Sequence, residues 1–475
     1  MNICLIRPNF GSYYQITPPL SLGYLSSALK NSGYSQIDLI DSSLYKLNPY
    51  QTFNILSQKE YEIVGIQVYT GAQNWSKEFI RLVKESRPNI NIIVGGPHIT
   101  ALKELALEYI NADFGVIGEG EKAIVDFVRF IQGEINDPRK IDGFMFKNSG
   151  GWVSAEKPYS LIENADTNPY PDWDLLQPQN YFKYMEGAMM PLRGNRPAPI
   201  LTSRGCPYQC TFCSGGVTSR HIMRFRSPEN IIKEIKYLVE HYGVNEIFFS
   251  DDNLTLNVQR AEELFDLIIK EKIEISWRAP NGIRIDTLTD SLVSKMSQSG
   301  GYYVGVGVET GNPEVMIRIK KRLNLNKINE SVNLLHKYGI KVSGFFICGL
   351  REETEKEVLD SIRFSLSIPF DRIQVCNFVP FPGSEDFDSI FGSKGGKEYK
   401  NNVNKFQEYG TIPKFNGMEL KEILKLQRKF LLKFYLRPKI VWQLISNIKF
   451  SQIIAILRHP FITKWLSFKK NRYDS

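Results

Sequence analysis

Three cysteines within eight residues are the feature of this chain that most clearly indicates chemistry. Cys206, Cys210 and Cys213 follow a C-x3-C-x2-C spacing, and the aromatic Phe212 stands directly before the last thiol. Three thiolates can hold a 4Fe–4S cluster and leave one iron without a protein ligand, whereas a cluster with four cysteine ligands only carries electrons. Because an iron with an open position can bind and activate a small molecule, the triplet predicts a reactive iron–sulfur site.

Two other interpretations of the triplet stay open from the residues alone. The three cysteines and His221 would complete a Cys3His zinc site. They could also be buried thiols without a chemical role. Zinc fingers usually bring their ligands as two separated pairs, so the compact triplet favours the cluster.

Length and composition describe a multidomain globular protein. The 475 residues are too many for one ordinary core and predict two or three domains. The apolar share of 42% and the charged share of 23% are typical of soluble proteins. Six cysteines in this length predict no disulfide framework, and Cys4, Cys348 and Cys376 lie in apolar runs as expected of core residues. With no secretory signal and no long apolar run, we expect a cytoplasmic protein without a membrane-spanning helix.

The positive charge is concentrated in the C-terminal tail. The chain has a formal net charge of +8, and residues 419–475 carry 13 Lys or Arg against three Asp or Glu, a net +10. The rest is therefore nearly neutral, and we expect no nucleic-acid partner. Helical periodicity returns in the tail from Met418, with Trp442 and other apolar residues among the cations. The pattern favours a helical cap on the preceding domain, and a peripheral helix on a membrane surface is the alternative.

The N-terminal third alternates strand and helix signals five times. Short apolar runs, rich in β-branched residues, predict strands at Ile3–Ile6, Ile37–Ile40, Ile63–Val68, Ile92–Val94 and Phe114–Ile117. Regular alternation of this kind predicts a parallel sheet with helices on both faces, whose ligands bind at the carboxyl ends of the strands. Glycines stand at several of these ends, where bare backbone would let a bulky ligand approach closely.

A second alternating series follows a linker rich in Pro, Asn, Asp and aromatic residues. The linker spans 144–195, and its aromatic content predicts an ordered bridge between domains. Strands are then predicted at Ile200–Ser203, Glu246–Ser250, Ile275–Arg278, Tyr302–Val308, Lys341–Cys348 and Arg372–Phe378. Six such units make a partial barrel rather than the full eight. The cysteines follow the first strand directly, at the end of a βα barrel where active sites lie.

These motifs together resemble a known family. The cysteine triplet, Gly307-Val308-Glu309 and Gly344-Phe345-Phe346-Ile347-Cys348-Gly349 resemble the radical S-adenosylmethionine (radical SAM) enzymes. The series Pro19-Leu20-x-x-Gly23-Tyr24-Leu25, Gly95-Gly96-Pro97-His98 and Gly118-Glu119-Gly120-Glu121 resembles the cobalamin-binding domain that precedes many radical SAM barrels. The resemblance implies an α/β fold with a Rossmann-like (flavodoxin-like) cobalamin-binding domain at 1–143, the linker at 144–195, a partial (β/α)6 TIM-type radical SAM core at 196–400, and a basic helical extension at 401–475.

The resemblance also implies site residues. Cys206, Cys210 and Cys213 would be the cluster ligands and the catalytic centre. Cofactor contacts in the barrel would come from Phe212, Asp251, Asp252, Arg284, Glu309, Gly344, Ile347 and Gly349. Cobalamin contacts would come from Pro19, Tyr69, Gly95, Gly96, Pro97, His98, Gly118, Glu119, Gly120 and Glu121.

Several of these residues have structural interpretations that the sequence leaves open. Asp252 could cap a helix, Arg284 could pair with Asp286, and His98 could merely form local hydrogen bonds. Gly344 and Gly349 could belong to a plain core strand. The Asp-x-His-x-x-Gly signature of classical cobalamin domains is absent, so no histidine is predicted as a lower axial ligand.

The implied function is that of a cobalamin-dependent radical SAM enzyme. Its 4Fe–4S cluster would cleave S-adenosylmethionine to a 5′-deoxyadenosyl radical, and the enzyme would methylate an unactivated carbon of a small-molecule or lipid substrate. An electron donor such as flavodoxin or ferredoxin would be a partner. The alternatives are a cobalamin-dependent radical cyclase or rearrangement enzyme and, in another class, a non-catalytic iron–sulfur or metal-binding protein that senses redox state.

Overall fold

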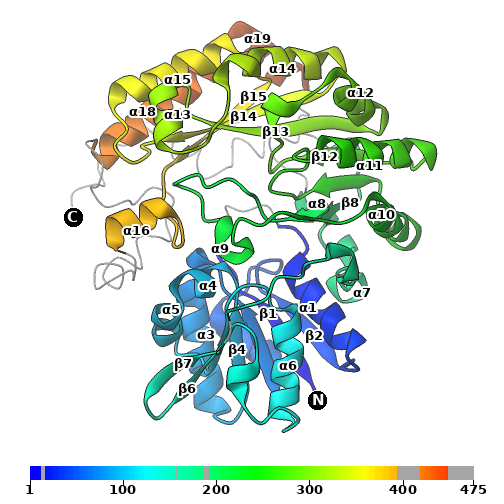
Figure 1. Ribbon diagram of the computed structural model, residues 1–475, viewed down its shortest axis with the longest axis vertical. Helices are drawn as coiled ribbons and strands as arrows, with labels where there is room; N and C mark the ends of the chain where they lie inside the picture. Colours follow the sequence, from blue (N-terminus) through cyan, green and yellow to red (C-terminus); the bar gives the residue numbers. More distant parts are fainter. Residues whose placement is uncertain (12–15, 157, 186–191, 393–417, 448–475) are drawn as a thin grey trace.

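The computed structural model shows two α/β domains stacked with their strand ends facing each other (Figure 1). It describes all residues except 12–15, 157, 186–191, 393–417 and 448–475. The chain builds the first domain, crosses to the second through a bridging segment, and returns across the first with a short helix before its C-terminal helices (Figure 1).

The first domain is built on a seven-stranded sheet of order β2-β1-β3-β4-β5-β6-β7. Its first five strands are parallel: β1 (Ile3–Arg7), β2 (Ile37–Asp41), β3 (Ile63–Gln67), β4 (Asn91–Gly95) and β5 (Phe114–Val116). The helices are α1 (Leu20–Asn31), α2 (Pro49–Leu56), α3 (Gln73–Ser86), α4 (Pro97–Leu102), α5 (Glu104–Ile110) and α6 (Glu121–Ile131). They cover both faces and form a separate apolar core on each. The predicted parallel α/β sheet is therefore confirmed.

A hairpin that sequence analysis assigned to the linker completes this sheet. Strands β6 (Phe144–Asn148) and β7 (Gly151–Ser154) pair antiparallel with each other, and β6 pairs antiparallel with β5. Phe144 is fully buried in the core of the first domain. The prediction that the linker begins at residue 144 is thus wrong by about ten residues. The signal that would have found the hairpin is the Asn148-Ser149-Gly150-Gly151 turn between two alternating runs.

The second domain is an open barrel of six parallel strands in the order β15-β14-β13-β12-β11-β8. The strands are β8 (Pro197–Ile200), β11 (Glu246–Phe249), β12 (Ser276–Ala279), β13 (Gly301–Glu309), β14 (Lys341–Cys348) and β15 (Arg372–Asn377). The outer helices are α10 (Pro228–Tyr242), α11 (Val258–Lys270), α12 (Asp290–Gln298), α13 (Pro313–Arg318), α14 (Leu325–Lys337) and α15 (Glu355–Ser367). The predicted count of six strands is confirmed, which makes this domain the expected partial barrel.

The first barrel strand is placed three residues earlier than predicted. Pairing with β11 stops at Ile200, because the backbone N–H of Thr202 donates to the carboxylate of Asp251 instead of to a neighbouring strand. The chain then forms a two-stranded antiparallel ribbon of β9 (Ser203–Arg204) and β10 (Arg224–Phe225). This ribbon brackets the cysteines and the one-turn helix α9 (Gly216–Ser219).

The described residues of the bridging segment, 155–195 without 157 and 186–191, pack against both domains. It contains α7 (Trp173–Leu176), α8 (Phe182–Met185) and the 3-10 turns Ala165–Thr167 and Pro178–Asn180. Trp173 lies in the barrel core, and its indole N–H donates to Glu234 at 3.0 Å. Asp172 accepts a hydrogen bond from Ser26 of α1 at 2.6 Å. The predicted ordered bridge is therefore what these residues form.

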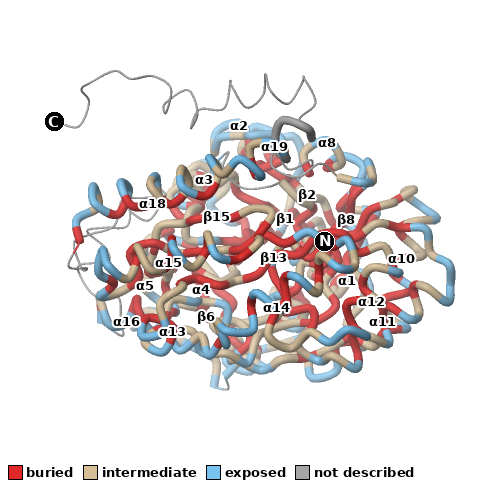
Figure 2. The backbone as a smooth tube through the Cα atoms, turned by 90° about the horizontal axis from the view of Figure 1, so that it is seen from above, coloured by how far each residue is buried: buried red, intermediate tan, exposed pale blue. Residues whose placement is uncertain are grey.

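The C-terminal helices pack on the body of the protein. Helix α16 (Glu385–Phe391) buries Phe387 and Phe391 in a core of the first domain. Helix α18 (Leu420–Tyr435) buries one face in the barrel core and exposes the other, as Figure 2 shows along its length. Helix α19 (Pro438–Asn447) follows at once. The helical-cap interpretation thus holds for α18, whose apolar face is occupied by protein; residues 448–475 lie outside the described part. Among the described helices, none is long and apolar enough to cross a membrane.

We predict that Phe430→Ala will destabilise the barrel by about 3–5 kcal/mol, because truncating a buried Phe leaves a cavity. Phe430 is fully buried, and its ring lies 5.0 Å from that of Phe346 in β14. Chemical denaturation followed by tryptophan fluorescence measures the change. The matched control is Trp442→Ala in α19, whose side chain is 72% exposed and whose loss should cost less than about 0.5 kcal/mol. Equal stability of wild type and Phe430→Ala would show that α18 does not cap the barrel.

Candidate active site

The cysteines lie in a loop between the two domains. We call residues 205–215 the cysteine loop; it leaves the barrel at the carboxyl end of β9 and leads into α9, which packs against α4 of the first domain. The two ends of the loop, Gly205 and Gly215, border a cavity of about 320 Å³, and the three cysteines lie between them without lining it. Both domains present the carboxyl ends of their parallel strands to this cavity, where ligands of such sheets bind.

Backbone contacts hold the cysteine loop in place. The N–H of Thr211 donates to the carbonyl of Ile319 at 3.0 Å. Thr211 also receives the N–H of Asp386 at 2.9 Å and donates its hydroxyl to that residue's carboxylate at 3.0 Å. At Gly205, where φ is +89°, an added Cβ would lie 2.4 Å from the carbonyl of Ile222. The turn before Cys206 therefore requires glycine.

The three thiols fit the donor set of a 4Fe–4S cluster. They lie close enough for their charges to act on one another, and the N–H of Gly215 donates to Sγ of Cys213 at 3.3 Å. Burial raises the pKa of the Cys210 thiol to about 11. Burial also raises the pKa of the Cys206 and Cys213 thiols, so iron that binds the three thiols must displace their protons.

The zinc interpretation finds no geometric support. His221, its fourth ligand, uses Nδ1 to contact the carbonyl of Tyr208 at 2.9 Å. Its ring packs against Gly216, where an added Cβ would lie 2.2 Å away. Within the part of the chain that the structure describes, no three His, Cys, Asp or Glu side chains converge to hold a single metal ion.

The two aspartates after β11 have different environments. Asp251 is buried and accepts hydrogen bonds from the N–H and hydroxyl of Thr202 and from the hydroxyl of Ser203, so it fastens the end of β8 to β11. Burial raises its pKa. Asp252 instead lines the cavity beside the cysteine loop and acts electrostatically on Cys206 and Cys213. Asp252 is thus the carboxylate that is placed to meet a bound ligand.

Arg284 and Glu309 both have partners within the protein. Arg284 forms an ion pair with Asp286 at 2.7 Å, the structural alternative from the sequence, and its guanidinium stacks on Tyr208 at 4.3 Å. Glu309 receives a hydrogen bond from Lys321 at 2.8 Å. It ends β13 with φ at +67°, next to an irregularity in the pairing with β14. Lys321 was not among the predicted site residues.

The predicted cofactor-binding motif of residues 344–349, at the end of β14, packs mainly against other side chains of the protein. An added Cβ at Gly344 would lie 3.0 Å from Phe370, and one at Gly349 would lie 2.7 Å from Ile423 of α18. The space beside these two glycines is therefore filled by side chains rather than left open for a ligand. Ile347 and Phe212 pack against one apolar cluster, so the cysteine loop and β14 share a contact surface.

The first domain contributes one wall of the cavity, in which glycines stand among apolar and polar side chains; we call it the glycine wall. The predicted residues that line the cavity are Tyr69, Gly95, Gly96, Pro97, Gly118, Glu119, Gly120 and Glu121. At Gly95 an added Cβ would meet nothing closer than Val116 at 3.7 Å, so no protein atom requires glycine there. Gly95 itself lines the cavity, so its bare backbone permits a flat, bulky cofactor to approach closely. These residues fit a cobalamin.

Two residues predicted for this wall lie away from it. Pro19 precedes α1 at its N-terminal cap position and does not line the cavity. His98 is buried beneath the wall, where its Nδ1 lies 3.3 Å from the hydroxyl oxygen of Thr70. Burial lowers the pKa of His98 to about 3, so the ring is neutral. Among the described residues that line the cavity there is no histidine.

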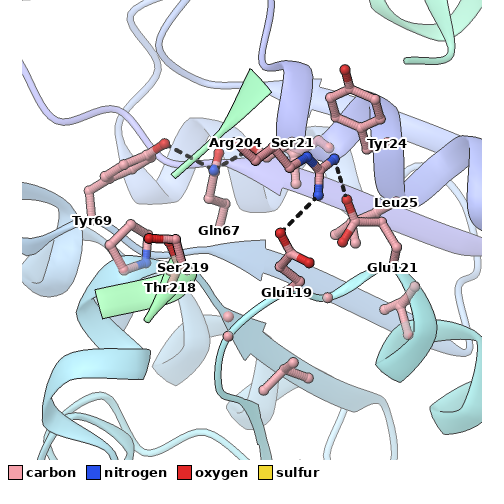
Figure 3. Close-up of a pocket in the computed structure, with 18 of the residues that line it drawn as sticks. Ser21, Tyr24, Leu25, Gln67, Tyr69, Glu119, Glu121, Arg204, Thr218 and Ser219 are labelled. Carbon is pink, nitrogen blue, oxygen red and sulfur yellow. Dashed lines mark hydrogen bonds and ion pairs between the residues drawn. The ribbon is translucent and has the colours of Figure 1, made fainter. Parts of the chain in front are cut away.

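Four charged residues join the two domains at the edge of the cavity. Arg204 and Arg224 stand directly opposite each other in the β9–β10 ribbon. Glu119 accepts two hydrogen bonds of 2.8 Å from Arg224, and Arg204 reaches Glu119 at 3.3 Å and Glu121 at 2.7 Å. Figure 3 shows the guanidinium of Arg204 between the two carboxylates. We call these four residues the interdomain clamp. The glutamates were predicted as cofactor contacts; the arginines were missed.

We predict that Glu119→Gln will destabilise the protein by about 3–5 kcal/mol, because it leaves the buried Arg224 without its counter-charge and Arg204 with Glu121 alone. Burial would raise the pKa of Glu119, but Arg224 and Arg204 outweigh it and lower the pKa. A lowered pKa stabilises the fold above the unfolded value, so the difference should shrink as the pH falls below about 4. Thermal melts at several pH values measure it.

The control for this prediction is Glu85→Gln, which breaks an exposed ion pair with Arg81 on α3. That change should leave the melting temperature unaltered, since exposed pairs contribute little. Hydrogen exchange should also quicken in β9 and β10 of Glu119→Gln. Unchanged exchange and stability would mean that the clamp does not hold the domains together.

Comparison with known proteins agrees with both halves of this site. The profile of the B12 binding domain matches residues 6–128, and that of the Radical SAM superfamily matches residues 200–365. An uncharacterised methyltransferase of Pyrococcus horikoshii is 30% identical over 425 residues, covering 89% of each chain. An anaerobic magnesium-protoporphyrin IX monomethyl ester cyclase of Rubrivivax gelatinosus is 25% identical, covering 89% of this chain and 75% of the cyclase.

A solved structure shares the fold. The radical S-adenosylmethionine methyltransferase TsrM of Kitasatospora setae, with cobalamin and a 4Fe–4S cluster bound, superposes with a TM-score of 0.65 at 16% identity, covering 84% of this chain and 75% of TsrM. The cysteine triplet, the facing glycine wall and the relative at 30% identity lead to one conclusion: the chain belongs to the radical SAM superfamily, in the group whose barrel follows a B12-binding domain.

Proposed function

We propose that this protein is a cobalamin-dependent radical SAM enzyme that methylates an unactivated carbon of a small-molecule or lipid substrate. The observation that carries the proposal is that the cysteine loop and the glycine wall border one cavity. Two cofactors bound at these places would face each other across the space where a substrate must lie. The methyltransferases among the relatives support methyl transfer.

The chain's own residues have distinct roles in this proposal. Cys206, Cys210 and Cys213 hold the 4Fe–4S cluster, and Asp252 pairs with the ammonium group of S-adenosylmethionine. The glycine wall and Tyr69 support the corrin ring of the cobalamin. When bound, the cluster with S-adenosylmethionine supplies a deoxyadenosyl radical and the cobalamin supplies a methyl group. The protein holds these groups in register and encloses them away from water.

Other parts of the chain extend the proposal. The boundaries are proposed at 1–154 for the cobalamin domain, 155–195 for the bridge, 196–400 for the radical SAM core and 401–475 for the helical extension. A flavodoxin or ferredoxin would deliver the electron to the exposed side of the cysteine loop, where Cys213 lies. Peripheral membrane contact would involve the exposed Trp442 and the basic residues around it, since the apolar face of α18 is already buried.

A second candidate function keeps both cofactors without methyl transfer. The cyclase of Rubrivivax gelatinosus, similar over 89% of this chain, favours a cyclisation or rearrangement. In another class, a non-catalytic iron–sulfur protein that senses redox state would bind a cluster without cleaving S-adenosylmethionine. Analysis of the reaction products distinguishes the methyltransferase, the cyclase and the redox sensor.

We predict that anaerobically reconstituted protein, given dithionite and S-adenosylmethionine, will form 5′-deoxyadenosine, and that Cys210→Ala will reduce this to background. The substitution removes one of three cluster ligands. Liquid chromatography with mass spectrometry measures the product, and iron analysis measures the cluster. Cys4→Ala is the control, since this thiol lies in a buried strand of the first domain and should leave both unchanged. A full cluster in wild-type protein without deoxyadenosine would indicate the redox sensor.

We predict that methylation will produce S-adenosylhomocysteine together with deoxyadenosine, because the spent methyl donor must be replaced from a second S-adenosylmethionine. Protein loaded with cobalamin and supplied with pools of candidate substrates is analysed for both products. In the control, cobalamin is omitted. S-adenosylhomocysteine should then no longer form, whereas 5′-deoxyadenosine should still form. Deoxyadenosine formed with a converted substrate but without S-adenosylhomocysteine would favour the cyclase.

A further inference from the structure

We propose that Lys321 is a positioning residue that sets the electrostatic potential at the cysteine loop, and that Glu309 holds its ammonium group there and moderates its charge. The inference deepens the proposed function and rests on it, since it assumes that the three cysteines carry a cluster. Neither the cysteine spacing nor the strand pattern pointed to Lys321.

The cysteine loop holds the segment that carries Lys321 on both sides. Before the lysine, the carbonyl of Ile319 accepts the N–H of Thr211, which lies between Cys210 and Cys213. After it, the carbonyl of Arg322 accepts a hydrogen bond from Arg284, and Arg284 stacks on Tyr208 of the loop. The position of Lys321 relative to the thiols is therefore fixed by one contact from the loop and by one from Arg284, which stacks on the loop.

Of three consecutive cations, only Lys321 points inward. Lys320 is exposed and pairs with Glu385 of α16, and Arg322 is also exposed. Lys320 and Arg322 both adopt positive φ values, of 54° and 53°, which side chains with a Cβ adopt infrequently. This backbone turns the ammonium group of Lys321 into the barrel mouth, where its side chain is 20% exposed.

The end of β13 is shaped around the same ammonium group. Glu309 accepts from Nζ of Lys321 at 2.8 Å and itself has a positive φ of 67°. At Gly307 an added Cβ would lie 2.5 Å from Oε1 of Glu309 and 2.9 Å from Nζ of Lys321. Three features make room for the ion pair of Glu309 and Lys321 at the end of β13. They are the missing side chain at Gly307, the irregular pairing with β14 and the left-handed backbone of Glu309.

The charge of Lys321 acts on all three thiols. It stabilises negative charge at Cys206, Cys210 and Cys213 alike, and Glu309 acts on Cys210 in the opposite sense. Asp252 and Arg284 also act on the thiols, and the carboxylate of Asp386, which pairs with Arg351, contacts Thr211 of the loop. Arg284 is paired with Asp286, and it acts on Cys206 among the three thiols.

A nearby cation favours the more negative state of a redox centre. Reduction adds one electron to a cluster held by three thiolates, and the cluster's potential depends on the charges and hydrogen bonds around it. Lys321 therefore makes reduction easier, and Glu309 limits that effect. The two members of the ion pair should act on the potential with opposite signs, whereas a merely structural pair would act with the same sign.

The experiment is a redox titration of the reconstituted full-length protein, followed by electron paramagnetic resonance of the reduced cluster without S-adenosylmethionine. Lys321→Met is expected to shift the midpoint potential to more negative values, and Glu309→Gln to more positive values. Lys321→Arg should stay near wild type because it keeps the charge. Lys320→Met, the neighbouring exposed lysine, is the matched control and should not shift the potential.

Shifts of the same sign in Lys321→Met and Glu309→Gln, or no shift in either, would overturn the inference. If Lys321→Met fails to retain iron, the sign of the Glu309→Gln shift decides. A wild-type protein that takes up no cluster would overturn the proposed function, and this inference with it. If the wild-type protein binds a cluster but neither substitution shifts its midpoint potential, this inference is overturned and the proposed function stands.

Discussion

The arrangement of the whole molecule depends on the neutralisation of two opposed arginines. Arg204 and Arg224 are direct partners in a two-stranded ribbon, a placement that repulsion between like charges would ordinarily destabilise. Glu119 and Glu121, from the end of a strand in the other domain, supply the counter-charges. The repulsion between Arg204 and Arg224 in the ribbon is therefore neutralised only when the two domains are in contact. Because Arg204 stands one residue before the cysteine loop, the same ion pairs set where that loop lies relative to the first domain.

Other contacts make this arrangement hard to open. Asp172 in the bridge accepts from Ser26 and pairs with Lys30 of α1, while the neighbouring Trp173 is buried in the barrel core. Helix α16 crosses back after the barrel, and its Asp386 holds Thr211 of the cysteine loop while Phe387 packs into the first domain. The bridge and helix α16 therefore each tie the two domains together, and α16 also contacts the cysteine loop directly. A site enclosed in this way suits a reaction in which water must be excluded.

The sequence predicted the fold well where burial alone determines it. Strand β1 is buried throughout, and such strands of parallel sheets are continuous apolar runs that are easily found. The prediction of β8 was less accurate because Pro197–Ile200 has a proline at each alternate position and owes its strand state to pairing with β11. Some contacts of the site could not be predicted from the sequence. Glu119 was predicted as a cofactor contact from its motif, but its ion-pair partner Arg224 lies 105 residues away in the chain, and no local pattern reveals such a pair. The glycines Gly344 and Gly349 permit close approach, but only the fold shows that Phe370 and Ile423 are what approaches them.

Residues with unfavourable backbone conformations gather around the cysteine loop. Arg220, His221, Glu309, Lys320 and Arg322 all have positive φ values without being glycine. Such conformations persist only where the surrounding contacts determine them, and here those contacts are visible in the hydrogen bond of His221 to the loop, the ion pair of Glu309 and the bond to the carbonyl of Arg322. The packing of the barrel core and the ion pairs of the interdomain clamp stabilise the folded state and offset the free-energy cost of these backbone conformations. Among the described residues, six further non-glycine residues with positive φ lie elsewhere, such as Asn111 after α5 and Lys272 after α11. Backbone strain alone therefore does not locate the site; what distinguishes the five positions here is that contacts to the cysteine loop or to the ion pair beside it hold them.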